Sequence, residues 1–170
     1  MLLSPRSRIP LRAGRALPYA PNGTPAGAFV LAVAAPALGM PVPAGALPGL
    51  APVLPVGAAA CASFGLAPGA LGPRLRDVFL VSNVAGSVLL PLTGAAVPRG
   101  TLPGWMRAAC ELLPLTHAAD AARRLADGAG LDRMLLGAEF AVGAGYAVLA
   151  LALLAVLERG SRRRATLDVM

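Results

Sequence analysis

Side chains that could do chemistry are few in this chain, and one common type is missing. The sequence contains no lysine, so that all 15 of its basic residues are arginine. A phosphate loop of the form G-x-x-x-x-G-K-[ST] and a Schiff-base enzyme both need a lysine. We therefore expect no ATP hydrolysis by the usual phosphate-loop route and no bound cofactor in this chain.

Metal and thiol sites also lack ligands. His117 is the only histidine, and Cys61 and Cys110 lie far apart without C-x-x-C spacing. Zinc sites and paired thiol sites need more ligands at closer spacing. We expect no metal and no catalytic residue here, and interpret the two cysteines as small apolar side chains, with a disulfide as the alternative.

The elements that must position the remaining polar residues are long apolar runs. The chain is uncharged from Ala16 to Pro73 and from Val78 to Pro98, and residues 134–157 carry a single charge. About 20 consecutive apolar residues cross the roughly 30 Å hydrocarbon core of a bilayer as a helix. With 56% hydrophobic and 14% charged residues, the composition also differs from that of soluble domains. The sequence predicts an all-α polytopic membrane protein.

About four transmembrane helices are predicted, near residues 27–42, 47–71, 78–97 and 134–157. With both termini in the cytoplasm, ten arginines lie inside and five lie in the loop over 98–133, as the positive-inside rule favours. The first span is short and rich in proline, so a re-entrant hairpin and a cleaved signal peptide are alternatives. Residues 1–25 form a basic segment that we expect to be disordered, ahead of a transmembrane domain over 26–170.

The arginines gather at the ends of the apolar runs and not along one face, which is why the bilayer, and not a nucleic acid, is the expected partner.

Residues 101–128 then form a loop with two short helices before the last span. Each is about a dozen residues long, too short to cross a bilayer, so we expect re-entrant or interfacial helices.

The pattern inside this loop is detailed. One face of the first helix is apolar and carries Trp105, Met106, Ala109, Leu112 and Leu113. Pro114 ends that helix, Thr116 can cap the second, and Gly128 stops it. Asp120 and Arg124 are expected to pair at i, i+4.

In the last span, the small residues Gly137, Ala141 and Gly145 predict a helix contact, unless their spacing arises by chance.

Several motifs, in a fixed order, resemble the permease subunits of type-2 ABC exporters, closest to the bacterial drug-, polysaccharide- and lipooligosaccharide-exporting branch. They are Phe64-Gly65-Leu66, Gly72-Pro73-Arg74-Leu75-Arg76-Asp77-Val78-Phe79, Asn83, Pro91-Leu92-Thr93-Gly94, Leu102-Pro103-Gly104-Trp105, Leu112-Leu113-Pro114-Leu115-Thr116-His117 and Ala121-Ala122-Arg123-Arg124-Leu125. The basic tail over 158–168 is similar to theirs as well.

The resemblance implies a permease of six spans that forms a homo- or heterodimer and docks onto ABC ATP-binding subunits. These subunits would drive export across the bacterial inner membrane, with both termini of the permease in the cytoplasm. Here only about 25 residues precede Gly27 where the family has two further spans, and that stretch resembles nothing in the family. A truncated or frameshifted gene is therefore the expectation.

Two groups of residues are candidate sites under this resemblance. Arg74, Arg76 and Asp77 could contact the ATP-binding subunit, or could form a solvated charged turn. His117 could act at an outer gate, or could be a hydrogen-bonded structural histidine. Trp105 is a candidate for the same outer path and suits the membrane interface, where its N–H stays hydrated.

Glu139 is the only charged residue within a predicted span. A carboxylate at the bilayer centre costs about 2.5–3.5 kcal/mol on insertion scales, so such groups usually face protein or water. Glu139 lies only about 7.5 Å along the helix from Met134. It is therefore either a polar group at the outer mouth of the path or at a subunit interface, or a side chain that snorkels to the membrane surface.

Two other functional classes remain open. A structural or assembly membrane protein, or an inactive permease remnant, would share the same apolar runs without transporting anything. A membrane enzyme would need polar catalytic groups gathered near one face of the membrane, and the sequence shows no such cluster.

Overall fold

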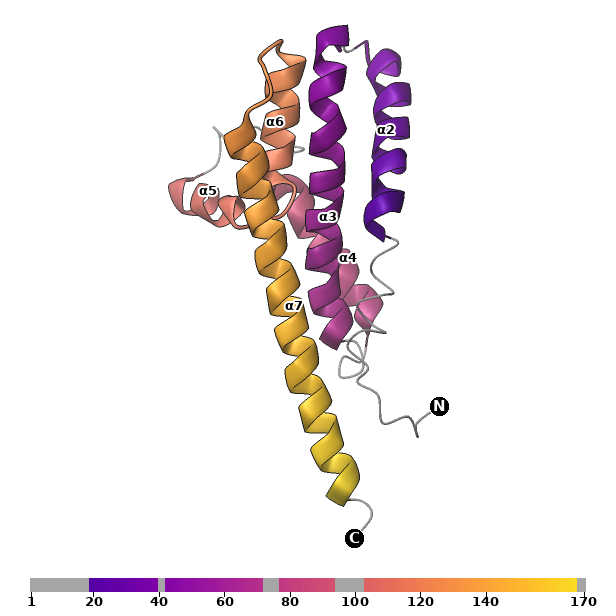
Figure 1. Ribbon diagram of the computed structural model, residues 1–170, viewed down its shortest axis with the longest axis vertical. Helices are drawn as coiled ribbons and strands as arrows, with labels where there is room; N and C mark the ends of the chain where they lie inside the picture. The colour runs from indigo at the N-terminus through magenta and orange to yellow at the C-terminus, as the bar shows by residue number, and fades with distance from the viewer. Residues whose placement is uncertain (1–18, 40–41, 72–76, 94–102, 168–170) are drawn as a thin grey trace.

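The computed structural model describes residues 19–39, 42–71, 77–93 and 103–167 (Figure 1). Within these ranges the regular structure is helical and contains no strand, which confirms the all-α prediction. The elements are α2 (Tyr19–Ala37), the 3-10 turn η1 (Ala44–Ala46), α3 (Leu47–Leu71), α4 (Val78–Leu92), α5 (Gly104–Glu111), α6 (Thr116–Ala126) and α7 (Arg133–Leu167).

Two stretches are long and apolar enough to cross a membrane. They are Ala44–Gly69, which is mostly α3, and Arg133–Leu157 in α7. α3 has the bounds of the span predicted near 47–71, since it runs from Leu47 to Leu71. The other two predicted spans correspond to α2 and α4, which do not meet the same criterion over their described residues.

The first predicted span, near 27–42, is displaced. α2 begins at residue 19 and ends at residue 37, and both Pro25 and Pro36 lie inside the helix. The turn that follows contains Gly39 at φ +65°, a conformation that glycine adopts without strain. Residues 19–25 are therefore helical and not disordered, and residues 1–18 of the predicted N-terminal segment lie outside the described residues.

The last helix is longer than the span predicted over 134–157. α7 has 35 residues and is about 52 Å long, well beyond the roughly 30 Å hydrocarbon core. In Figure 1 its C-terminal end, drawn in yellow, extends past the other helices. The charged residues after Leu157 end the apolar span, but they do not end the helix.

The central helix is α3, which contacts α2, α4, α6 and α7 and lies between α2 and the α6–α7 pair in Figure 1. Small residues allow the close approach. A Cβ added to Gly143 of α7 would lie 3.0 Å from Cα of Ala60 in α3, and one added to Gly57 would lie 3.2 Å from Cβ of Ala118 in α6. Backbones this close are typical of helix packing through small residues.

The stripe of small residues predicted as a helix contact makes no such contact within the described part of this chain. Gly137, Ala141 and Gly145 are all exposed, and among the described residues no atom outside the helix lies within 4 Å of a Cβ added to either glycine. The buried side of α7 instead carries Gly143 and Ala150. Small residues occur all round this helix, so their spacing alone could not identify the packed face.

Candidate functional site

The α5–α6 hairpin confirms the prediction of two short helices over 101–128. α5 lies across the bundle, whereas α6 runs alongside α3 and α7 (Figure 1). Residues 112–115, here called the elbow, join the two helices. Pro114 is buried in the elbow. The helix is interrupted there because proline has no N–H with which to continue the helical hydrogen bonds.

The first turn of α6 has no cap of its own. Leu115 occupies the N-cap position with φ +73° and makes no side-chain cap hydrogen bond. A positive φ is strained for a leucine, at about 1–3 kcal/mol. Thr116, the predicted cap, is instead the first residue of the helix; it is buried, and its Oγ1 has no hydrogen-bond partner within the described residues.

The cap comes from α7. Glu139 Oε1 accepts a hydrogen bond from the backbone N–H of Leu115 at 2.6 Å. Its Oε2 accepts from the backbone N–H groups of His117 at 3.1 Å and Ala118 at 3.2 Å. One carboxylate thus receives three backbone donors from a segment 21 to 24 residues earlier in the chain.

The side chain of Glu139 is fully buried, with 0% of its surface exposed. The snorkelling interpretation is therefore wrong for this structure. Burying an unpaired carboxylate is costly, but a helix N-terminus carries a partial positive charge and free N–H groups. Each partner satisfies the other: the carboxylate receives donors, and the first turn of α6 receives its acceptor.

His117 contacts both sides of the elbow. Its backbone N–H donates to Glu139, and its ring Nε2 lies 3.1 Å from the carbonyl oxygen of Glu111 in α5. Since a carbonyl oxygen only accepts, Nε2 must carry the proton in this contact. This geometry supports the structural interpretation of His117, and its role at a gate stays a prediction.

Trp105 does not share the buried environment of Glu139. Its ring is 72% exposed on α5, and Leu112 is 70% exposed on the same predicted apolar face. The buried position of α5 is Cys110, a free cysteine, as expected from its interpretation as a small apolar side chain, although it was not placed on the predicted apolar face. The predicted apolar face is thus only partly packed against the protein, and Trp105 is available to the surrounding solvent or lipid.

The other end of α6 is held by polar contacts near the α6–α7 turn. Arg124 Nη1 pairs with Asp132 Oδ2 at 2.7 Å, and Arg123 Nη1 pairs with Asp120 Oδ1 at 3.2 Å. The predicted pair of Asp120 with Arg124 is therefore wrong. Gly128 follows the helix at φ +82°, which confirms its predicted role as the stop signal.

The candidate cytoplasmic contact is described only in part. Arg74 and Arg76 lie outside the described residues. Asp77 is the N-cap of α4, and its Oδ1 accepts from the N–H of Leu80 at 3.0 Å. This is a local structural role, and a contact with an ATP-binding subunit stays a prediction.

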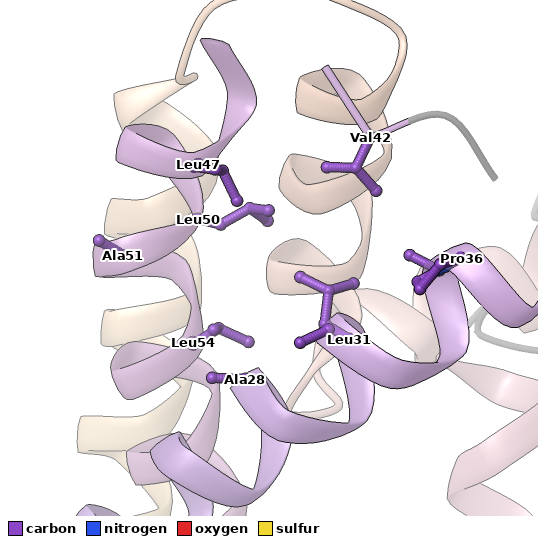
Figure 2. Close-up of a pocket in the computed structure, with 10 residues that line it drawn as sticks. Ala28, Leu31, Pro36, Val42, Leu47, Leu50, Ala51 and Leu54 are labelled. Carbon is purple, nitrogen blue, oxygen red and sulfur yellow. The ribbon is translucent and has the colours of Figure 1, made fainter. Parts of the chain in front are cut away.

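An apolar pocket of about 380 Å³ lies between α2 and α3 (Figure 2). Its lining is aliphatic throughout and consists of Ala28, Leu31, Ala32, Ala35, Pro36, Val42, Leu47, Leu50, Ala51 and Leu54. Such a lining can hold apolar groups but supplies no acid, base or nucleophile. Elsewhere in the described ranges, no three His, Cys, Asp or Glu side chains come together to hold a metal ion.

Sequence reasoning singled out Glu139 but missed its partners. One local signal was available: a helix begins after Pro114-Leu115, where no Ser, Thr, Asp or Asn occupies the N-cap position. A helix start without its own acceptor needs one from elsewhere. Which acidic residue supplies it depends on how α6 and α7 pack, and no spacing rule gives that.

Comparison with known proteins gives one finding. A family model described as ABC-2 type transporter matches residues 1–125 of the 170-residue chain. The match includes the first 25 residues, so the interpretation that this stretch resembles nothing in the family is wrong. The similarity of the tail after residue 125 stays a prediction. Neither the curated proteins nor the solved structures gave a match.

Proposed function

This chain belongs to the ABC-2 type transporter family, and on that premise we propose that it is the permease subunit of an ATP-driven exporter. The family supplies the membrane component of ABC transporters and not the catalytic one. The translocation path would form between this chain and a second permease copy, with separate ABC ATP-binding subunits below it. The observation that carries this proposal is the family match over residues 1–125.

The proposed topology has four membrane segments and both termini in the cytoplasm of a bacterial cell, with the bilayer being the inner membrane. The start of α2 and the end of α7 lie toward one end of the bundle in Figure 1, and the α6–α7 turn lies toward the other. This agrees with an even number of crossings. The ten arginines near the proposed cytoplasmic side support the same orientation.

The α5–α6 hairpin would then lie at the outer side of the membrane. α5 has eight residues and α6 has eleven, whereas about 20 are needed to cross. The exposed ring of Trp105 suits the interface between lipid and water. In this arrangement the hairpin forms the outer end of the export path.

The test is reconstitution with an ABC ATP-binding subunit, first of all one encoded beside this gene. The two chains should copurify and hydrolyse ATP together, and vesicles should accumulate cargo only with ATP. The matched control is the same complex with the phosphate-loop lysine of the ATP-binding subunit replaced by alanine. ATP hydrolysis by this chain alone, above a mock preparation, would contradict the proposal.

Absence of any complex with such ATP-binding subunits would favour the alternative class, a structural membrane protein or an inactive permease remnant. That class shares the apolar helices and the family match, and it differs in having no ATP-dependent step.

A further inference from the structure

The carboxylate of Glu139 holds a helix to which it does not belong. We infer that Glu139 is a positioning residue: its negative charge fixes the α5–α6 hairpin against α7 and, resting on the export function proposed above, keeps the outer end of the path in a working geometry. It acts through the hairpin backbone and touches no cargo in this account.

The first step of the argument is that α6 depends on this acid. A serine or aspartate at the N-cap position normally supplies the missing acceptor locally. Here the position holds Leu115 in a left-handed conformation, and the next residue, Thr116, makes no cap bond. The N–H groups of Leu115, His117 and Ala118, which all donate to Glu139, would have no acceptor within the described residues without it.

The second step is that charge matters here, beyond size. Three donors converge on the two oxygens of Glu139, and an ionised carboxylate offers only acceptors. A glutamine of the same size would turn an NH₂ group toward those donors. An aspartate keeps the charge but is one methylene shorter. If residue 139 acts as a cap, the hairpin should be held most firmly by Glu, less firmly by Asp and least firmly by Gln. If it acts only by packing, the order should be Glu, then Gln, then Asp.

The third step is that the contact joins separate elements. Glu139 lies in α7, whereas its donors lie in the elbow and the first turn of α6. The opposite end of α6 is joined to α7 by the exposed pair of Arg124 and Asp132. The elbow end is the end next to α5, so release of Glu139 would free α5 together with the elbow.

Cys110 provides a native reporter of that release, because its side chain is 0% exposed at the last turn of α5. The full chain, with Cys61→Ala to leave one thiol, is treated in membranes with N-ethylmaleimide, and the labelling rate of Cys110 is measured. We expect Glu139→Gln to label at least about tenfold faster than the parent, and Glu139→Asp to fall between the two. The matched control is Glu111→Gln, an exposed glutamate on α5, which should label at the parent rate.

A Glu139→Gln chain that labels as slowly as the parent would overturn the inference, as would Glu139→Asp labelling faster than Glu139→Gln. If the Glu139→Gln chain does not accumulate in cells, amide hydrogen exchange in the unmodified chain tests the inference instead. The amides of His117 and Ala118 should exchange at least about tenfold more slowly than those of Met134 and Leu135, which the more exposed Asp132 caps. Equal or faster exchange would overturn the inference.

Export is measured separately in the reconstituted complex. A fall in export in the order Glu, Asp, Gln supports a role at the outer path, and unchanged export alongside fast Cys110 labelling would overturn that role. A parent complex that exports nothing, with the labelling order as expected, would refute the proposed function alone and leave the positioning role standing.

Discussion

Among the described helices, α4, α6 and α7 each begin with a carboxylate that accepts hydrogen bonds from their first N–H groups, and the clearest contrast is between α6 and α7. α7 is capped by Asp132, the residue just before it, whose Oδ1 accepts from the N–H groups of Met134 at 2.9 Å and Leu135 at 3.4 Å. α6 is capped by Glu139, which lies more than 20 residues away and is fully buried. Asp77 at the start of α4 follows the local pattern.

The difference shows how one chemical contact can have two structural uses. A local cap such as Asp132 stabilises the helix that follows it, and water can replace the exposed carboxylate in part. A distant buried cap also ties two elements together, and nothing replaces it when it is lost, because an unsatisfied buried donor keeps its full desolvation cost. The comparison therefore predicts unequal effects for similar substitutions.

The largest effect is expected for Glu139→Gln. It replaces a carboxylate that receives three buried donors, so we expect the free energy of unfolding to fall by about 3 kcal/mol. Asp132→Asn, at the local cap, should cost about 1 kcal/mol or less. Equilibrium unfolding of both variants in micelles provides the measurement. Equal decreases in the free energy of unfolding would show that the distant cap stabilises the fold no more than the local cap does.

The second prediction extends the comparison along α7. Gly143→Ala should destabilise the fold by about 2 kcal/mol, because the new Cβ would lie 3.0 Å from Cα of Ala60, a backbone atom that cannot rotate away. Gly145→Ala is the control: its Cβ meets nothing within 4 Å, so it should be neutral or slightly stabilising. Thermal unfolding of both variants checks this prediction. A destabilising effect of Gly145→Ala would indicate that the exposed face of α7 makes a contact that the structure does not show.

The third prediction concerns the elbow that Glu139 holds. Leu115→Ile conserves volume but places a β-branched side chain at φ +73°, which should cost about 1–2 kcal/mol. Leu112→Ile, at an ordinary φ of −86° three residues earlier, should be nearly neutral. Unfolding free energies of the two variants test the strain at Leu115 directly. Similar values would indicate that the elbow adapts and stores no strain.

The smallest effect is expected at the exposed end of α6. Arg124→Gln removes the ion pair with Asp132. The side chain of Arg124 is 58% exposed and that of Asp132 is 29% exposed, so the free energy of unfolding should fall by about 0.5 kcal/mol or less. It should also shrink as salt is raised. A loss comparable to that of Glu139→Gln would mean that both ends of α6 are equally important to its position.

Local signals in the sequence predicted much of the fold. The span predicted near 47–71 matches α3, Pro114 indicated the break between α5 and α6, and Gly128 indicated the end of α6. These signals work because each acts within one turn of backbone, through a missing N–H, a charge or a positive φ. α2 was misplaced because residues 19–25, which were assigned to the N-terminal segment, belong to the helix even though Pro25 lies within it.

The contacts between helices could not be read in the same way. α7 is apolar nearly all round, so no amphipathic stripe identified its buried face, and the stripe through Gly137 proved to be exposed. Arg124 had two acidic residues within reach, and the choice of Asp132 depends on where the α6–α7 turn places it. The cap by Glu139 depends on the packing of α6 against α7, and this is set by the whole bundle.

The central claim is that this chain is a membrane permease with both ends on the cytoplasmic side and the α6–α7 turn outside. Single cysteines are introduced at Asp127, which is exposed in that turn, and at Asp168 near the C-terminus, after Cys61→Ala and Cys110→Ala. Intact cells are then treated with a membrane-impermeant maleimide. We expect labelling at position 127 in intact cells, and at position 168 only after the membrane is opened. Labelling at position 168 in intact cells with protection at position 127 would contradict the account.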